Sequence, residues 1–219
     1  MHSFIYLASQ SPRRQELLTQ LGARFELLLP GSDEDAEAIE APLPNEKARV
    51  YVERVTLAKC AAALERWKKR RLPWAPILCA DTTVSLPQSD GAQILGKPSD
   101  SAHAARILRL LSGQTHEVLT ALALMPNQNA KPIGLVQVSE VEFTELTDKR
   151  IAAYIASGEP MGKAGAYGIQ GLGGAFIRRI RGSYSGIMGL PLFETATLLE
   201  EAGVACSLTT PTAIRAEYE

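Results

Sequence analysis

Apolar residues fall into short runs along this chain, and amphipathic stretches separate them. Short apolar runs predict strands, whereas apolar spacing near 3.6 residues predicts helices. Strands are expected at 4–8, 25–29, 77–80, 117–124, 135–146 and 175–180, and helices at 12–21, 45–71, 99–111, 147–157 and 191–202. The apolar residues 84–86 and 94–95 about a turn at 89–91 extend the run 77–80 into a strand or hairpin that presents Asp81. Because strand and helix do not alternate regularly, we expect an α/β fold other than a doubly wound sheet, with two lobes around a cleft.

Length and composition are those of an ordinary globular chain. The 219 residues are 46% hydrophobic, which argues against disorder or a fibre. Residues 1–206 are expected to form a single domain and residues 207–219 a loosely held tail, since no repeat or low-complexity linker divides the chain.

Charge and cysteine content narrow the partners and the compartment. The formal net charge is −1, so an anion site must be local, and the basic run at 66–71 is typical of a helix C-terminus. Three scattered cysteines, no signal-peptide pattern and no apolar run near ~20 residues predict a cytoplasmic protein without a membrane span. We expect neither nucleic acid nor membrane as a partner. The oligomeric state stays open, with a homodimer among the options.

The segment after the first predicted strand carries Ser9, Ser11, Pro12, Arg13 and Arg14. Ser11 is expected as a helix N-cap and Pro12 as the first helical residue. A helix N-terminus presents unpaired N–H groups and partial positive charge, and arginine matches phosphate oxygens bidentately. Adjacent arginines on a first turn can also simply face solvent. Their combination with two serines at a strand end favours a phosphate site.

Two carboxylates are candidates for catalysis or metal binding. Asp81 ends the apolar run 77–80, where it suits a general base or a Mg²⁺ ligand, although it could instead be a turn aspartate that caps the backbone. Glu34 lies in an acidic loop that is either solvated or a source of hard oxygen ligands. Lys59, Lys97 and Lys163 lie outside the charge runs, and each has a structural alternative.

A glycine-dense loop spans 165–174, where the backbone can approach a ligand closely. Gln170 is its side chain with both a donor and an acceptor, so its amide can match the N3–H and O4 of thymine or uracil. The alternative is a loop glutamine that bonds to nearby backbone.

Taken together, these segments resemble the Maf (septum-formation-inhibitor) family of nucleoside triphosphate pyrophosphatases. The resemblance extends in family order from residue 5 to about residue 203. It is carried by Leu7–Leu18, Asp33–Glu34, Lys59, Ala80–Thr82, Gly96–Pro98, Leu111–His116, Lys163–Gly171 and Gly189–Pro191.

This resemblance implies a mixed, curved sheet similar to that of inosine-triphosphate pyrophosphatases, with two lobes flanking a cleft. It also implies hydrolysis of a nucleoside triphosphate to the monophosphate and pyrophosphate. Arg13, Thr82 and Gln170 match the dTTP/UTP branch of the family rather than the 7-methyl-GTP branch. One departure is Gly162, where the family often has aspartate, and it leaves the role of Lys163 open.

The resulting hypothesis assigns a role to each candidate. Asp81 takes a proton from the attacking water, and Glu34 belongs to a carboxylate site for Mg²⁺ or Mn²⁺. Thr82 and Gln170 read the base. The triphosphate is held by Ser9, Arg13, Arg14, Lys59 and Lys97. Two alternatives remain: a 7-methyl-GTP pyrophosphatase, and a non-enzymatic regulator of cell division that binds nucleotide.

Overall fold

The computed structural model describes residues 1–32, 34, 38–88 and 91–209. Of the sequence-based expectations, Asp33 and residues 210–219 of the predicted tail lie outside this range. The division into one domain of 1–206 with two lobes stays a prediction.

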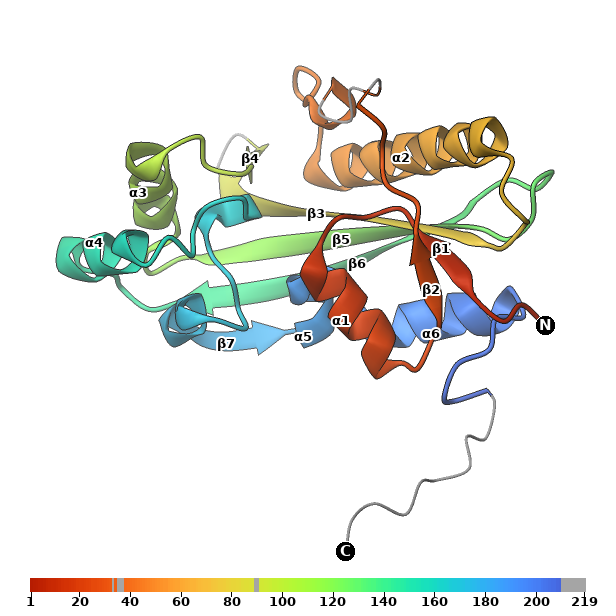
Figure 1. Cartoon of the computed structure of the whole chain (residues 1–219). Coiled ribbons are helices and arrows are strands. Elements are labelled where there is room, and N and C mark those ends of the chain that lie inside the picture. Colours follow the sequence, from red (N-terminus) through yellow and green to blue (C-terminus); the bar gives the residue numbers. More distant parts are fainter. Residues whose placement is uncertain (33, 35–37, 89–90, 210–219) are drawn as a thin grey trace, which may run out of the picture.

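One mixed sheet organises the described residues (Figure 1). Its strand order is β2-β1-β3-β5-β6-β7, and β4 pairs with the later part of β3. β1 is parallel to β2 and β3, whereas the other pairs are antiparallel. The strands are β1 (Ile5–Leu7), β2 (Phe25–Leu27), β3 (Ile77–Gln88), β4 (Gly91–Leu95), β5 (Thr115–Met125), β6 (Ile133–Phe143) and β7 (Ile177–Arg181). The predicted mixed α/β fold is therefore confirmed.

Helices cover both faces and one end of the sheet (Figure 1). The long α2 packs on one face, while α1 and α6 pack on the other, and α3 and α4 lie together at one end. The helices are α1 (Pro12–Gln20), α2 (Ala48–Arg70), α3 (Ser101–Leu111), α4 (Asp148–Ala156), α5 (Tyr184–Met188) and α6 (Leu192–Glu201), and the 3₁₀ turns are η1 (Ala38–Glu40), η2 (Ala164–Ala166) and η3 (Leu172–Phe176). The helix α5 and the three 3₁₀ turns were not predicted, since each is too short to show periodicity.

Side chains of β3 alternate between the two helix layers. Ile77 and Cys79 are buried with α2, whereas Leu78 and Ala80 are buried with α1 and α6. A strand places successive side chains on opposite faces. Asp81 therefore points towards α2, and its neighbour Thr82 points towards α1.

A gap in strand pairing opens beside these two residues. On one edge, β3 pairs with β1 only at residues 77 and 78, and with β4 from Val84 onwards. Among the described residues, 79–83 have no strand partner on that edge, although β5 pairs with them on the other. The strand or hairpin expected to present Asp81 is confirmed. β3 continues through Asp81 and Thr82 to Gln88, and β4 pairs with it antiparallel.

Candidate active site

A cleft of about 760 Å³ lies at this gap, and all ten side chains predicted to form the site line it. They come from the β1–α1 connection, α1, the segment before η1, α2, β3, the segment after β4, and the glycine-rich loop with the residue before η2. These side chains are Ser9, Arg13, Arg14, Glu34, Lys59, Asp81, Thr82, Lys97, Lys163 and Gln170. The sequence-based selection therefore brought together residues that meet in space.

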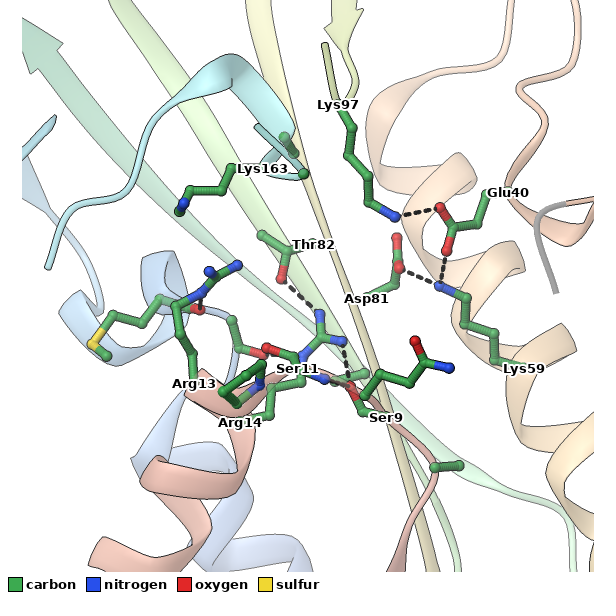
Figure 2. A pocket seen from close by; sticks show the side chains of 18 of the residues that line it. Ser9, Ser11, Arg13, Arg14, Glu40, Lys59, Asp81, Thr82, Lys97 and Lys163 are labelled. Atoms are coloured by element: carbon green, nitrogen blue, oxygen red, sulfur yellow. Dashed lines mark hydrogen bonds and ion pairs between the residues drawn. The ribbon is translucent and has the colours of Figure 1, made fainter. Parts of the chain in front are cut away.

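Two lysines and two carboxylates form a cluster on the α2 side of the cleft (Figure 2). The Lys59 ammonium donates to Asp81 Oδ1 at 2.6 Å and to Glu40 Oε1 at 2.7 Å. The second Glu40 oxygen accepts from Lys97 at 2.9 Å. Partial burial raises the pKa of Glu40, but the hydrogen bonds and charges of Lys59 and Lys97 outweigh it, and the net pKa is lowered. Glu40 is therefore held as an anion between two cations.

Glu40 is the site residue that sequence reasoning missed. It belongs to the same acidic segment as Glu34 and ends the 3₁₀ turn η1. The available signal was only that segment's acidic composition, because nothing in the local sequence distinguishes one glutamate from another.

Glu34 itself is bound to a buried arginine. Its Oε2 accepts from Arg66 Nη2 at 2.6 Å, and its Oε1 accepts from Arg66 Nε at 2.8 Å and from the Gly31 amide at 3.0 Å. Arg66 also donates to the Leu28 carbonyl and is 7% exposed, so this member of the basic run 66–71 is not on a solvated helix end. Metal binding by Glu34 stays a prediction. A metal ion there would have to share the Glu34 carboxylate with the Arg66 guanidinium.

The two arginines of α1 form the opposite wall (Figure 2). Arg14 donates to the Gly189 carbonyl at 2.8 Å, to Ser9 Oγ at 3.0 Å and to Thr82 Oγ1 at 3.2 Å. Burial lowers the pKa of Arg14, although a guanidinium stays charged at any ordinary pH. Arg13 donates to the Met188 carbonyl at 3.3 Å. The last carbonyls of a helix lack intrahelical partners. The end of α5 therefore supplies two acceptors that orient both guanidiniums.

Ser11 begins α1, as predicted, but its side chain makes no capping hydrogen bond. The Ser11 amide instead donates to Ser9 Oγ at 3.3 Å. Ser9 thus accepts from both a backbone amide and Arg14, and it ties the loop to the guanidinium wall.

The glycine-rich loop closes the remaining side of the cleft. Gly165 has a φ of +69°, and a Cβ there would lie 2.8 Å from the Val84 side chain, so only glycine fits. The Lys163 ammonium donates to the Glu159 carbonyl. Burial, and to a smaller extent the charge of Arg13, lower the pKa of Lys163. Gln170 is an exposed residue of the loop and lines the cleft.

Comparison with known proteins decides the family. A family model described as Maf-like protein matches residues 4–202. This chain belongs to the Maf family. Similar relatives include the dTTP/UTP pyrophosphatase of Albidiferax ferrireducens, 57% identical over 93% of this chain and 98% of that protein, and that of Ralstonia nicotianae, 58% identical over 93% and 96%. The dTTP/UTP pyrophosphatase of Cupriavidus pinatubonensis is 55% identical over 92% and 98%.

A solved structure is also similar to part of this Maf chain. It is a nucleoside-triphosphatase / dITP/XTP pyrophosphatase from Mycobacterium abscessus, 15% identical, covering 64% of this chain and 73% of that one with a TM-score of 0.40.

The donor set of this Maf cleft fits a divalent cation. Asp81 and Glu40 already share the positive charge of Lys59, and Mg²⁺ uses one or two such carboxylates together with substrate phosphates. Within the described residues, no group of three or more histidine, cysteine or acidic side chains forms a ready cage. Magnesium held partly by phosphates does not need such a cage. Among the described helices, none is long and apolar enough to cross a membrane.

Proposed function

We propose that this protein is a nucleoside triphosphate pyrophosphatase that hydrolyses dTTP and UTP to the monophosphate and pyrophosphate. The observation that carries the proposal is the arrangement of the cleft. A carboxylate at the sheet gap is held by Lys59, and it faces a wall of two guanidiniums inside one cavity. The names of the relatives and the matching Arg13, Thr82 and Gln170 support the choice of nucleotide.

In this proposal Asp81 acts as the general base. It accepts a proton from a water whose oxygen attacks the α-phosphorus, and the bond from that phosphorus to the bridging oxygen of the β-phosphate breaks. Lys59 fixes one Asp81 oxygen, and a carboxylate has further lone pairs with which to accept the proton. Pyrophosphate leaves with the electron pair of the broken bond.

The cations bind the triphosphate and offset the charge that develops on the leaving group. Ser9, Arg13 and Arg14 act from the α1 wall, and Lys59 and Lys97 act from the α2 side. Glu40 would hold Mg²⁺ or Mn²⁺ together with the substrate phosphates, and Glu34 stays a further candidate. The metal supplies charge neutralisation at the phosphates. Thr82 and Gln170 contact the base, and the cytoplasm is the proposed location.

The decisive experiment is a substrate panel. Purified protein with Mg²⁺ is given dTTP, UTP, dCTP, GTP and 7-methyl-GTP, and release of pyrophosphate is measured against release of orthophosphate. We expect pyrophosphate from dTTP and UTP. Preference for 7-methyl-GTP would support the other branch of the family. Binding without turnover of any nucleotide would support a non-enzymatic regulator.

A further inference from the structure

The Thr82 hydroxyl belongs to a chain of hydrogen bonds that runs from the sheet interior to the guanidinium wall. Thr82 and Thr120 are paired across β3 and β5, and their Oγ1 atoms are 2.9 Å apart. Thr120 is fully buried, and its Oγ1 lies 2.7 Å from the Gly186 carbonyl. At the other end, Arg14 Nη2 lies 3.2 Å from Thr82 Oγ1.

The direction of every hydrogen bond in this chain follows from its ends. A carbonyl can only accept, so Thr120 donates its single hydroxyl hydrogen to the Gly186 carbonyl. Thr82 must then donate to Thr120. A guanidinium can only donate, so Thr82 accepts from Arg14 with one of its two lone pairs. The Thr82 hydroxyl therefore has one acceptor site and no hydrogen left for a ligand.

We propose that Thr120 is a positioning residue for base selection, because it makes Thr82 an obligate acceptor towards the cleft. This inference rests on the proposed function. Thymine and uracil present an N3–H donor, which an acceptor-only hydroxyl can bind, and Gln170 then donates its amide hydrogen to O4. Cytosine presents a bare N3 acceptor, which would face a second acceptor with no hydrogen between them. A buried, fixed hydrogen-bond polarity of this kind rejects a mismatched partner more strongly than a rotating hydroxyl does.

Gly186 gives the chain its fixed end. Its carbonyl belongs to α5, at whose C-terminal end the carbonyls of Met188 and the C-cap Gly189 accept from Arg13 and Arg14. The same short helix thus determines that the Thr82 hydroxyl donates to Thr120, and it fixes the orientation of both guanidiniums.

Replacing Thr120 tests the proposal. Thr120→Val removes the hydroxyl at similar volume and releases the Thr82 hydrogen, which can then donate to the N3 of cytosine. We expect the ratio of kcat/KM for dTTP to that for dCTP to fall at least about tenfold, the size of one misplaced hydrogen bond. Thr120→Ser keeps the donor and should keep the ratio. In a Thr82→Val background, Thr120→Val should change the ratio no further.

Thr195→Val is the matched control. Thr195 is also fully buried and donates to a carbonyl, that of Pro191, but it does not line the cleft. It should lose stability with an unchanged nucleotide ratio, as a purely structural hydroxyl does. If Thr120→Val does not fold, Thr120→Cys, whose thiol is a weak donor, should shift the ratio in the same direction. An unchanged ratio in a folded variant that still hydrolyses dTTP would overturn the inference, whereas a wild-type protein without pyrophosphate release would overturn the proposed function.

Discussion

Lys59 balances the charge of the cleft, because its ammonium contacts both Asp81 and Glu40. Burial raises the pKa of Glu40, and the hydrogen bonds and charges of Lys59 and Lys97 lower it further than burial raises it. A triphosphate that enters the cleft brings charge to the same two lysines that now hold Glu40. Lys59 and Lys97 therefore neutralise Glu40 now and are placed to contact the phosphates of a bound substrate.

Replacing the proposed base makes a prediction at the scale of a single residue. Asp81→Asn keeps the shape of the side chain but removes its ability to take a proton, so we expect turnover of dTTP to fall about 10²–10⁴-fold. Circular dichroism should show a folded protein. Asp148→Asn, an exposed carboxylate paired with Arg109, serves as the control and should keep full pyrophosphate release. Near-normal turnover by Asp81→Asn would remove Asp81 from its role.

Gln170 makes a second prediction at this scale. Gln170→Glu replaces an amide that both donates and accepts with a carboxylate that only accepts, at the same size. We expect kcat/KM for dTTP and UTP to fall relative to the other nucleotides of the panel. Gln128→Glu, at an exposed turn, adds the same charge away from the cleft and should leave the preference intact. The assignment of Gln170 to the base fails if its variant selects nucleotides as the wild type does.

Among the elements, the glycine-rich loop has the most specific support. Glu159 accepts from Tyr154 Oη at 2.8 Å and from the amides of Leu172 at 2.8 Å and Gly173 at 3.0 Å. Tyr154 Oη in turn accepts from the Gly168 amide at 3.2 Å. One carboxylate and one phenol therefore fix both ends of the segment that presents Gln170.

Glu159→Gln tests this support. The amide nitrogen cannot accept, so at least one of the three hydrogen bonds is lost and the loop that carries Gln170 loosens. We expect KM for dTTP to rise about fivefold, equivalent to one net hydrogen bond of about 1 kcal/mol, with little change in kcat. Glu145→Gln, on an exposed loop residue, is the control. An equal fall in kcat at constant KM would show that Glu159 acts in some other way.

Across the whole molecule, a buried histidine connects the sheet to this loop. His116 of β5 is fully buried, and its Nε2 lies 2.9 Å from the Tyr167 hydroxyl. Its ring also packs edge-on against Phe143 and Tyr167. Burial lowers the pKa of His116 to about 4, so the folded protein keeps this ring neutral.

The pH dependence of stability follows from that shift. Between about pH 6.5 and pH 4 the unfolded chain binds a proton at His116 that the folded protein does not bind, so the free energy of unfolding falls as the pH falls. The contribution of His116 over this window is about 3 kcal/mol. Urea denaturation at several pH values should show this loss in the wild type and a flatter dependence in His116→Gln. Equal slopes for both proteins would contradict the assignment.

Local order along the chain was well determined by the sequence. Ser11 and Pro12 mark the start of α1, glycines mark helix ends, and apolar runs mark the strands, because these signals act through backbone geometry within a few residues. All ten side chains selected from the sequence line the cleft, whereas Glu40 was missed. The strand or hairpin that presents Asp81 was also predicted, because apolar runs flank a turn there, and β3 and β4 form it.

Only the tertiary structure decided which charged and polar groups meet. Glu34 forms an ion pair with Arg66, and Glu40 forms ion pairs with Lys59 and Lys97. The carbonyls of Met188 and Gly189 accept hydrogen bonds from the two arginines of α1. The two partners of each such contact are far apart in sequence, and their distance depends on how helices pack on the sheet. The sequence by itself therefore determined the helices and strands and the residue types of this cleft. The packing of the helices on the sheet determined which of these residues donate and accept hydrogen bonds to one another.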